Sequence, residues 1–104
     1  MALKSFSLDE LKAAQAKGER LYHEFLRVPA MSAGLYVLKA GGVDPQKPHK
    51  EDEVYVILAG RGKFVCEGET IDVEPGQTIY VPAGDEHRFL DIAEDLEILV
   101  IFAP

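Results

Sequence analysis

The sequence has only one cysteine and no long apolar run. Each of these features, where abundant, would indicate a particular class of protein. Its one cysteine, Cys66, cannot form an internal disulfide, so a disulfide-stabilised fold is not expected. No run approaches the roughly 18 apolar residues needed to cross a bilayer, and the first residues lack the apolar segment of a signal peptide. We therefore expect a cytoplasmic protein with no membrane partner.

Basic residues are also scarce. Lys and Arg number 11 against 18 Asp and Glu, which gives a formal net charge of -7. Nucleic-acid recognition usually needs a clustered basic face, because the phosphate backbone is anionic. We therefore expect no nucleic-acid partner.

The chain has the composition of a small folded domain. It has 104 residues, of which 47% are hydrophobic and 28% charged, as in ordinary globular proteins. Residues 1–19 are expected to form a helical extension, since Ser7 and Glu10 have the spacing of a capping box and Gly18 is a suitable stop. Residues 20–104 are expected to form one β domain.

Short runs rich in Val, Ile, Tyr and Phe alternate with Gly and Pro from about residue 20 onward. We interpret Gly60-Arg61-Gly62 as a hairpin turn and Asp91–Glu97 as containing an exposed turn. The pattern predicts strands over residues 21–27, 33–39, 53–59, 63–67, 69–74, 77–81, 87–92 and 96–102. Short, evenly spaced strands indicate an all-β fold, an antiparallel sandwich or barrel.

One set of polar side chains precedes an apolar run at even spacing. His49, Glu53 and Tyr55 are separated by even intervals. Side chains alternate along an extended strand, so these three are expected to point to one face. The same parity places Lys47 on that face and Gln46 on the opposite one.

A second even set, which begins with His87 and Phe89, follows a turn containing proline and glycine. Imidazole and carboxylate groups that converge inside a barrel would form a metal site with nitrogen and oxygen ligands. Two histidines and one carboxylate are typical of non-haem Fe(II), although Zn, Mn, Ni and Cu accept similar sets. We therefore expect one divalent transition metal as cofactor.

The order of these residues resembles the cupin superfamily, whose first motif is G-x5-H-x-H-x3/4-E-x6-G. The segment that matches it is GGVDPQKPHKEDEVYVILAG, with Gly41, His49, Glu53 and Gly60 at fixed positions. The resemblance implies an antiparallel cupin (jelly-roll) β-barrel preceded by a short N-terminal helix.

The second cupin motif, G-x5-P-x-G-x2-H-x3-N, also has a counterpart. It is GQTIYVPAGDEHRFLD, in which Gly76, Pro82, Gly84 and His87 fall on the specified positions. Carried over residue by residue, the two motifs imply His49, Glu53 and His87 as metal ligands.

The sequence departs from the family pattern at Lys47, which replaces the first motif histidine, and mildly at Asp91, which replaces asparagine. Four alternatives follow for the missing ligand. Lys47 itself could bind the metal as a neutral amine, or Gln46 could supply its amide oxygen if the chain bulges at Pro48. Water or substrate could complete a three-residue shell beside Lys47. Finally, the site could be degenerate and hold no metal.

The resemblance implies a range of functions, because small cupins include dioxygenases for phenolic or diketone substrates and isomerases for sugars or acids. We expect a metal-dependent enzyme, dioxygenase-like or isomerase-like, that binds a small anionic or phenolic molecule inside the barrel. Its substrate pocket is expected to include Lys47, Tyr55 and Phe89, and no catalytic group beyond the metal ligands is evident. The alternative is a non-catalytic small-molecule binding or sensor protein.

A homodimer is also expected. Several predicted strands, such as VYVILA, are apolar on both faces, so the outer face needs cover. The strand predicted over residues 21–27 could extend a partner's sheet.

Overall fold

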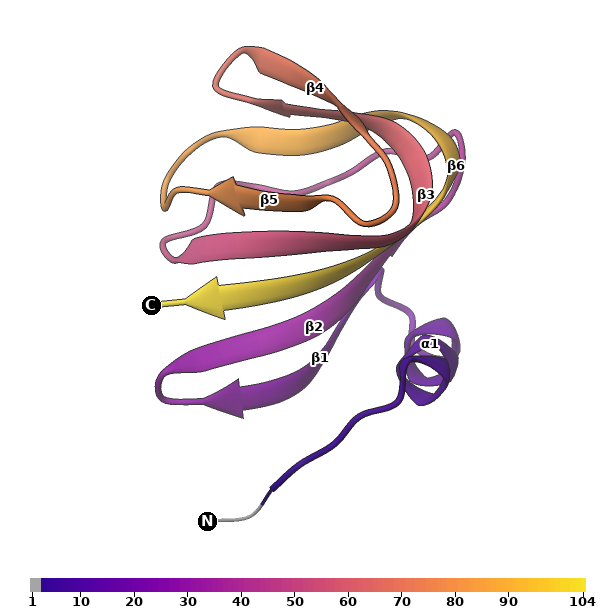
Figure 1. Cartoon of the computed structure of the whole chain (residues 1–104), viewed down its shortest axis with the longest axis vertical. Coiled ribbons are helices and arrows are strands. Elements are labelled where there is room, and N and C mark those ends of the chain that lie inside the picture. Colours follow the sequence, from indigo (N-terminus) through magenta and orange to yellow (C-terminus); the bar gives the residue numbers. More distant parts are fainter. Residues whose placement is uncertain (1–2) are drawn as a thin grey trace.

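The structure is a computed structural model that describes residues 3–104. Over these residues the chain forms one helix followed by six strands (Figure 1). Their bounds are α1 Leu8–Lys17, β1 Tyr22–Val28, β2 Met31–Leu38, β3 Asp52–Cys66, β4 Glu69–Val73, β5 Thr78–Val81 and β6 His87–Ala103.

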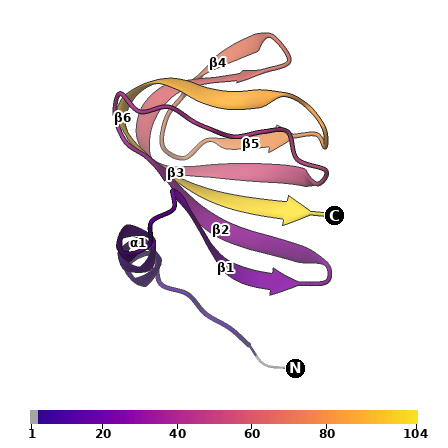
Figure 2. The ribbon, with the colours of Figure 1, turned by 180° about the vertical axis from the view of Figure 1, so that it is seen from behind.

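The helix α1 begins and ends where the sequence predicts. The Ser7 side chain accepts a hydrogen bond from the Glu10 backbone N–H, and Gly18 is the C-cap. The helix packs loosely, because Leu8 is 41% exposed. It lies beside β1 and β2 (Figures 1 and 2), and Lys12 forms an ion pair with Glu97 of β6 at 3.1 Å.

The strands form one strongly curved antiparallel sheet with the order β1-β2-β6-β3-β4, and β5 pairs with β3. The first half of β3 pairs with the end of β6 and with β5, whereas its second half pairs with the beginning of β6 and with β4. Because β3 and β6 bend together, the sheet curls over on itself (Figure 1). This confirms the predicted all-β antiparallel fold, although the sheet does not close in the described part of the chain.

The two longest strands correct the predicted boundaries. Strands 53–59 and 63–67 are one strand, β3, and strands 87–92 and 96–102 are one strand, β6. The predicted hairpin turn at Gly60 is therefore wrong, and so is the predicted exposed turn within residues 91–97. The chain bends at Gly60 without reversing, with φ +96°, and its Cα lies so close to the Asp95 backbone that a Cβ would overlap the carbonyl oxygen. Only glycine fits this bend.

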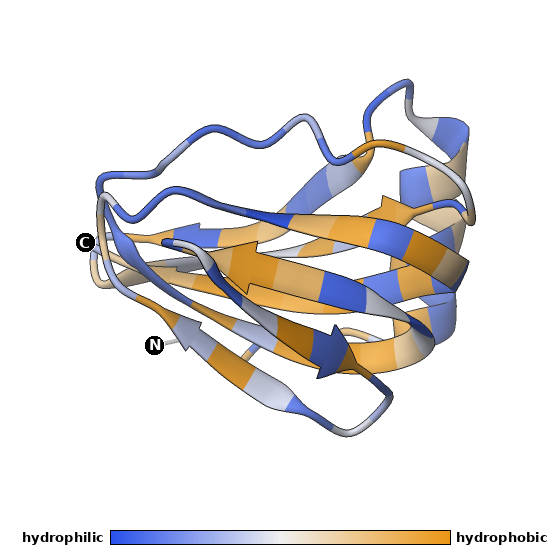
Figure 3. Cartoon of the chain, turned by 90° about the horizontal axis from the view of Figure 1, so that it is seen from above, coloured by the Kyte–Doolittle hydropathy of each residue, from blue (hydrophilic) through white to orange (hydrophobic). Residues whose placement is uncertain are grey.

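Apolar side chains from both halves of the curved sheet fill its interior. Figure 3 shows that the strands carry most of the apolar residues, interrupted by polar ones, and that the connecting segments are mostly polar. The largest buried side chains include Tyr55, Phe89, Leu96 and Ile98. This core holds β3 and β6 against each other and thereby sets the distance between the residues that they carry.

The expectations about a membrane, a homodimer and a domain boundary at residue 19 go beyond the arrangement of the strands. Among residues 3–104, no helix is long and apolar enough to span a membrane. Strand β1 lies at an edge of the sheet, with β2 as its strand partner. The homodimer, and the division of the chain at residue 19, stay predictions.

Candidate metal centre

Glu53 is held inside the curled sheet by β3. It and Tyr55 point to the same face, as the parity argument predicts, and both are buried, with 1% and 0% of their surface exposed. The Tyr55 hydroxyl lies 2.8 Å from Glu53 Oε1 and donates to it. One oxygen of a buried carboxylate is thereby oriented by its neighbour on the strand.

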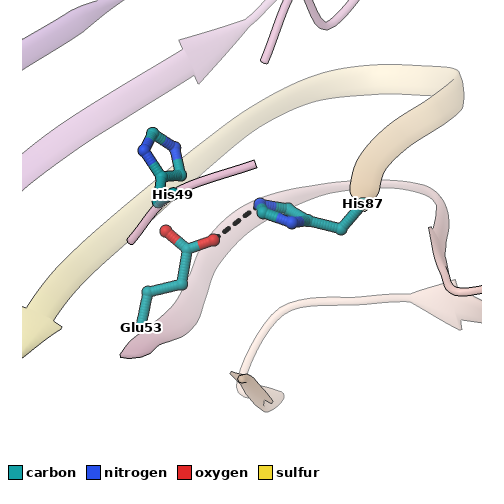
Figure 4. A group of neighbouring side chains, drawn as sticks. All are labelled: His49, Glu53 and His87. Atoms are coloured by element: carbon teal, nitrogen blue, oxygen red, sulfur yellow. Dashed lines mark ion pairs between the residues drawn. The ribbon is translucent and has the colours of Figure 1, made fainter. Parts of the chain in front are cut away.

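His87 approaches Glu53 from the other half of the sheet, at the first residue of β6. Its Nδ1 lies 2.7 Å from the Asp85 carbonyl oxygen. A carbonyl only accepts hydrogen bonds, so Nδ1 carries a hydrogen and Nε2 of the neutral ring is left with its lone pair. This Nε2 faces Glu53 Oε1 at 2.6 Å (Figure 4).

His49 reaches the same place from a loop. It lies in the segment between β2 and β3, where its backbone carbonyl accepts a hydrogen bond from Gly84 N at 2.7 Å. Its ring packs edge-on against Phe102, with the ring centroids 4.9 Å apart. The two cupin-like segments therefore meet at His49 and Gly84, and strand alternation is not what brings His49 towards Glu53.

The three side chains leave atoms free for a metal. Nitrogens of His49 and His87 and an oxygen of Glu53 all lie within 4.8 Å of one another. Glu53 Oε2 is buried and has no hydrogen-bond partner among residues 3–104, and the buried His87 Nε2 has only the contact with Glu53 Oε1. Buried polar atoms are usually paired, and two imidazoles with one carboxylate suit a transition metal, so the residues present fit a divalent ion.

The electrostatics of His87 reflect two opposing effects. Burial lowers the pKa of His87, but the contacts with the Glu53 carboxylate and the Asp85 carbonyl outweigh it, so the pKa is raised above its usual value. Without a metal, His87 therefore tends to hold a proton in the position that a metal would take.

Asp44 holds the loop that carries His49. Its side chain is buried, and Oδ2 accepts from Phe89 N on β6 at 2.8 Å and from Gln46 Nε2 at 2.7 Å. Oδ1 accepts from the Tyr36 hydroxyl on β2 and from Gln46 N. A single carboxylate thus fastens the loop to two strands.

Gln46 and Lys47 are placed opposite to the parity prediction. Gln46 turns inward, where its Oε1 lies 2.8 Å from the Tyr55 hydroxyl, whereas Lys47 is exposed. The parity argument is wrong here because residues 46 and 47 are not in an extended strand. Gln46 therefore lies beside the metal-ligand candidates, and its role as a ligand stays a prediction.

A cavity adjoins this group of residues. It has a volume of about 530 Å³ and lies between β1, β2, the end of β6 and the loop that carries His49. Its lining includes Tyr22, Tyr36, Gln46, His49, Val100 and Phe102. A site of this size, with apolar walls and a few polar groups, is typical of small-molecule binding.

Three residues expected in the substrate pocket do not line this cavity. Lys47 is exposed, and Tyr55 and Phe89 are buried in the core, where their rings pack at 5.1 Å between centroids. Their pocket roles stay predictions. The sequence reasoning did not identify Asp44 or Tyr22, because no local pattern distinguishes a buried loop aspartate or a strand tyrosine that faces a cavity.

Known proteins resemble this chain in sequence. The family model described as Cupin domain matches residues 34–102. An uncharacterized protein of Streptomyces coelicolor is 49% identical over 102 residues, which cover 98% of this chain and 97% of that protein. Acireductone dioxygenase of Geobacillus thermodenitrificans is 34% identical over 59 residues, 51% of this chain, and this chain spans 32% of the dioxygenase.

Solved structures resemble the fold. A cupin 2 conserved barrel domain protein of Salinispora arenicola superposes with a TM-score of 0.77 at 18% identity, covering 100% of this chain and 91% of that one. A DMSP lyase of Ruegeria pomeroyi superposes with a TM-score of 0.69 at 27% identity. That match covers 74% of this chain and 40% of the lyase.

Proposed function

This chain belongs to the cupin domain family, and from that premise we propose that it is a small metal-binding cupin. His49, Glu53 and His87 hold one divalent transition metal, and a small molecule binds in the adjoining cavity. The observations that support this most directly are two buried atoms beside the His49 ring: Glu53 Oε2, which has no hydrogen-bond partner among residues 3–104, and His87 Nε2, which has only the contact with Glu53 Oε1. A bound ion would satisfy them.

The donor set suits Fe, Mn, Zn, Ni or Cu, since all accept imidazole and carboxylate ligands. When bound, such an ion supplies a Lewis acid that polarises a substrate oxygen at an open position. The chain's own residues orient the ligands. Asp85 fixes the ring hydrogen of His87 on Nδ1, and Tyr55 holds one oxygen of Glu53.

The remaining ligand position has two candidates in this arrangement. One is Gln46, whose amide oxygen lies 2.8 Å from the Tyr55 hydroxyl, the same hydroxyl that contacts Glu53, and the other is water or substrate. Lys47 is a poor candidate, because its side chain is exposed and an ammonium must lose a proton before it can bind a metal.

We propose a metal-dependent enzyme, dioxygenase-like or isomerase-like. The acireductone dioxygenase and DMSP lyase matches support an enzyme, but each covers less than half of the relative's length. The exposed Lys47 in place of a motif histidine favours the alternative, a non-catalytic binding or sensor protein. Detection of an exchangeable water on the bound metal would support the enzyme. Binding of an organic molecule by metal-free protein would support the alternative.

Elemental analysis of tag-free protein purified without chelator tests the proposed metal site. We expect about one equivalent of a transition metal per chain, because one group of three ligands is present among the described residues. Apoprotein that takes up none of Fe(II), Mn(II) and Zn(II) on incubation would contradict the proposed metal site. It would favour the alternative, a non-catalytic binding or sensor protein.

Metal affinity is expected to fall at acid pH. Because the pKa of His87 is raised, the metal-free protein keeps a proton on this ring up to a higher pH than an ordinary histidine. A metal must displace that proton, so the apparent affinity should decrease by about tenfold per pH unit below the pKa and level off above it. Zn(II) titrations of the apoprotein between about pH 5 and 8 measure this, and an affinity that does not change with pH would contradict it.

A further inference from the structure

A second cavity adjoins the one beside the proposed metal site. It has a volume of about 400 Å³ and lies where the turn between β1 and β2 meets the end of β6. We call it the outer cavity, and the one beside the metal site the inner cavity. The residues that line both are Arg27, Ser32, Glu51 and Phe102. A molecule in the inner cavity can therefore extend into the outer one.

Three of the shared residues belong to a row that crosses the sheet from the metal site. Residues directly opposite one another on neighbouring strands form this row, in the order Glu53 of β3, Phe102 of β6, Ser32 of β2 and Arg27 of β1. Directly opposite residues point to the same face of a sheet, so the whole row shares the inner face with the Glu53 carboxylate. Neighbouring strands lie about 4.8 Å apart, so Ser32 is about 10 Å from Glu53 along the sheet.

Ser32 has the smallest side chain of this row. It is buried, and its neighbours in the row are the much larger Phe102 and Arg27. Since Ser32 lines both cavities, its small side chain leaves space between them that a larger one would fill.

A β-bulge brings two charged residues of β1 to the same face. Residues three apart point to opposite faces of a regular strand. The register shift between Glu24 and Leu26 adds one residue, so that Glu24 and Arg27 both face inward and pair at 2.6 Å. The charge of Arg27 is therefore neutralised within the strand.

The charges along the row differ at its two ends. At the inner end Glu53 carries one negative charge, less than the charge of a divalent metal, so an electron-rich oxygen donor is attracted there. At the outer end Arg27 is paired, and Glu51 adds a carboxylate that would repel an anionic group. The other arginine of the inner cavity, Arg20, does not line the outer one.

The rest of the outer cavity is apolar. The lining residues that it does not share with the inner cavity are Val28, Pro29, Met31 and Pro104. Each CH₂ group buried against such walls tightens binding by about fourfold. The outer cavity therefore suits an uncharged hydrocarbon group.

We propose that the outer cavity is a second subsite, which binds the apolar tail of an elongated molecule whose oxygen-donor head binds the metal. The small side chain of Ser32 keeps the passage between head and tail open. The inference rests on the proposed function, because it assigns a chemical class to the small molecule of the same site.

Two hydroxamates test the proposal, because this group binds a transition metal through its two oxygens. Acetohydroxamate is the head with one methyl group, and decanohydroxamate adds a straight hydrocarbon tail. In calorimetric titrations of the zinc-loaded protein, the dissociation constant of decanohydroxamate should be at least about a hundredfold lower. NMR signals of Met31, which lines the outer cavity and not the inner one, should move with decanohydroxamate but not with acetohydroxamate.

Variants at Ser32 separate the space at this position from its hydroxyl. In Ser32→Leu the larger side chain fills the passage, so the decanohydroxamate dissociation constant should rise about tenfold or more. The acetohydroxamate constant should stay within about twofold, because the head lies two strands away. Ser32→Ala keeps a small side chain and should bind both compounds as the native protein does.

A second pair of variants avoids a buried position. Pro29 is an exposed residue of the turn between β1 and β2, and Pro29→Asp brings a charge to the outer cavity. The decanohydroxamate constant should rise about five- to tenfold, because the charged group stays hydrated and keeps part of the tail in water. Pro75→Asp, at an exposed turn proline between β4 and β5, is the matched control and should change neither constant.

The proposal is overturned if the native protein binds both hydroxamates equally, or if neither Ser32→Leu nor Pro29→Asp weakens decanohydroxamate relative to acetohydroxamate. A loss in Ser32→Ala as large as that in Ser32→Leu would also overturn it. If Ser32→Leu no longer holds zinc, the comparison of Pro29→Asp with Pro75→Asp decides the result.

Zinc content and acetohydroxamate binding of the same samples keep the two proposals apart. Protein that holds zinc and binds acetohydroxamate, but binds decanohydroxamate no more tightly, contradicts the tail subsite alone. Protein that takes up no zinc contradicts the metal site, and with it the subsite that rests on it.

Discussion

Replacing His87 by alanine is expected to remove the metal from the protein. His87 supplies the Nε2 that faces Glu53, and its loss leaves His49 and Glu53 as the only members of the group of three in the described chain. Loss of a residue that merely supports a metal ligand weakens binding by about 10- to 100-fold, so loss of a ligand should exceed about a hundredfold. Elemental analysis and a competition titration with a chromophoric chelator would measure the change.

His49→Ala should have the same effect, because it removes the other imidazole of the group. His23→Ala is the matched control, since His23 is a half-buried histidine of β1 that is not a member of the group. It should retain the native metal content. Equal metal content in His87→Ala, His49→Ala and the native protein would show that these side chains are not ligands.

Asp44→Ala is expected to cause the largest loss of stability at the site. The change leaves the Tyr36 hydroxyl, the Phe89 N–H and the Gln46 amide without their common acceptor in a buried place. Each unsatisfied buried donor costs about 1–3 kcal/mol, so we expect the free energy of unfolding to fall by about 3–5 kcal/mol. This is a large part of the total stability of a small domain, which is about 5–15 kcal/mol. Urea denaturation followed by circular dichroism would measure the loss.

The matched control for Asp44 is Asp95→Ala. Asp95 holds the beginning of the same loop by accepting from Ala40 N at 2.8 Å, but its side chain is 53% exposed, so water can replace it. We expect a much smaller loss of stability. Asp44→Ala should also weaken metal binding, because His49 lies on the released loop, whereas Asp95→Ala should weaken it less. An equal effect of the two variants would contradict the proposed anchoring role.

The sequence predicted the class of fold well but not the course of its two longest strands. Glycine near residue 60 indicates a turn when only local pattern is considered. In the structure β3 and β6 pair along their whole length, and Gly60 allows a bend against the Asp95 backbone. A bend and a hairpin turn use the same residue types, so only the pairing partner, which is distant in sequence, distinguishes them.

The same distinction applies to the side chains near the metal ligands. Strand alternation correctly placed Glu53 and Tyr55 on one face, because both lie in β3. It failed for Gln46 and Lys47, where hydrogen bonds to Asp44 and Tyr55 turn Gln46 inward. Periodicity describes regular backbone and has no meaning in a loop.

The sequence by itself determined the family, the β architecture and the three candidate ligands, since these depend on residue types at fixed spacing. The tertiary structure decided which atoms remain unpaired, that Asp44 fastens the loop, and that the cavity lies beside Tyr22 instead of Lys47. The reason is physical. Burial and hydrogen-bond satisfaction are properties of neighbours in space, and the residues that meet at this site come from four separate segments of the chain.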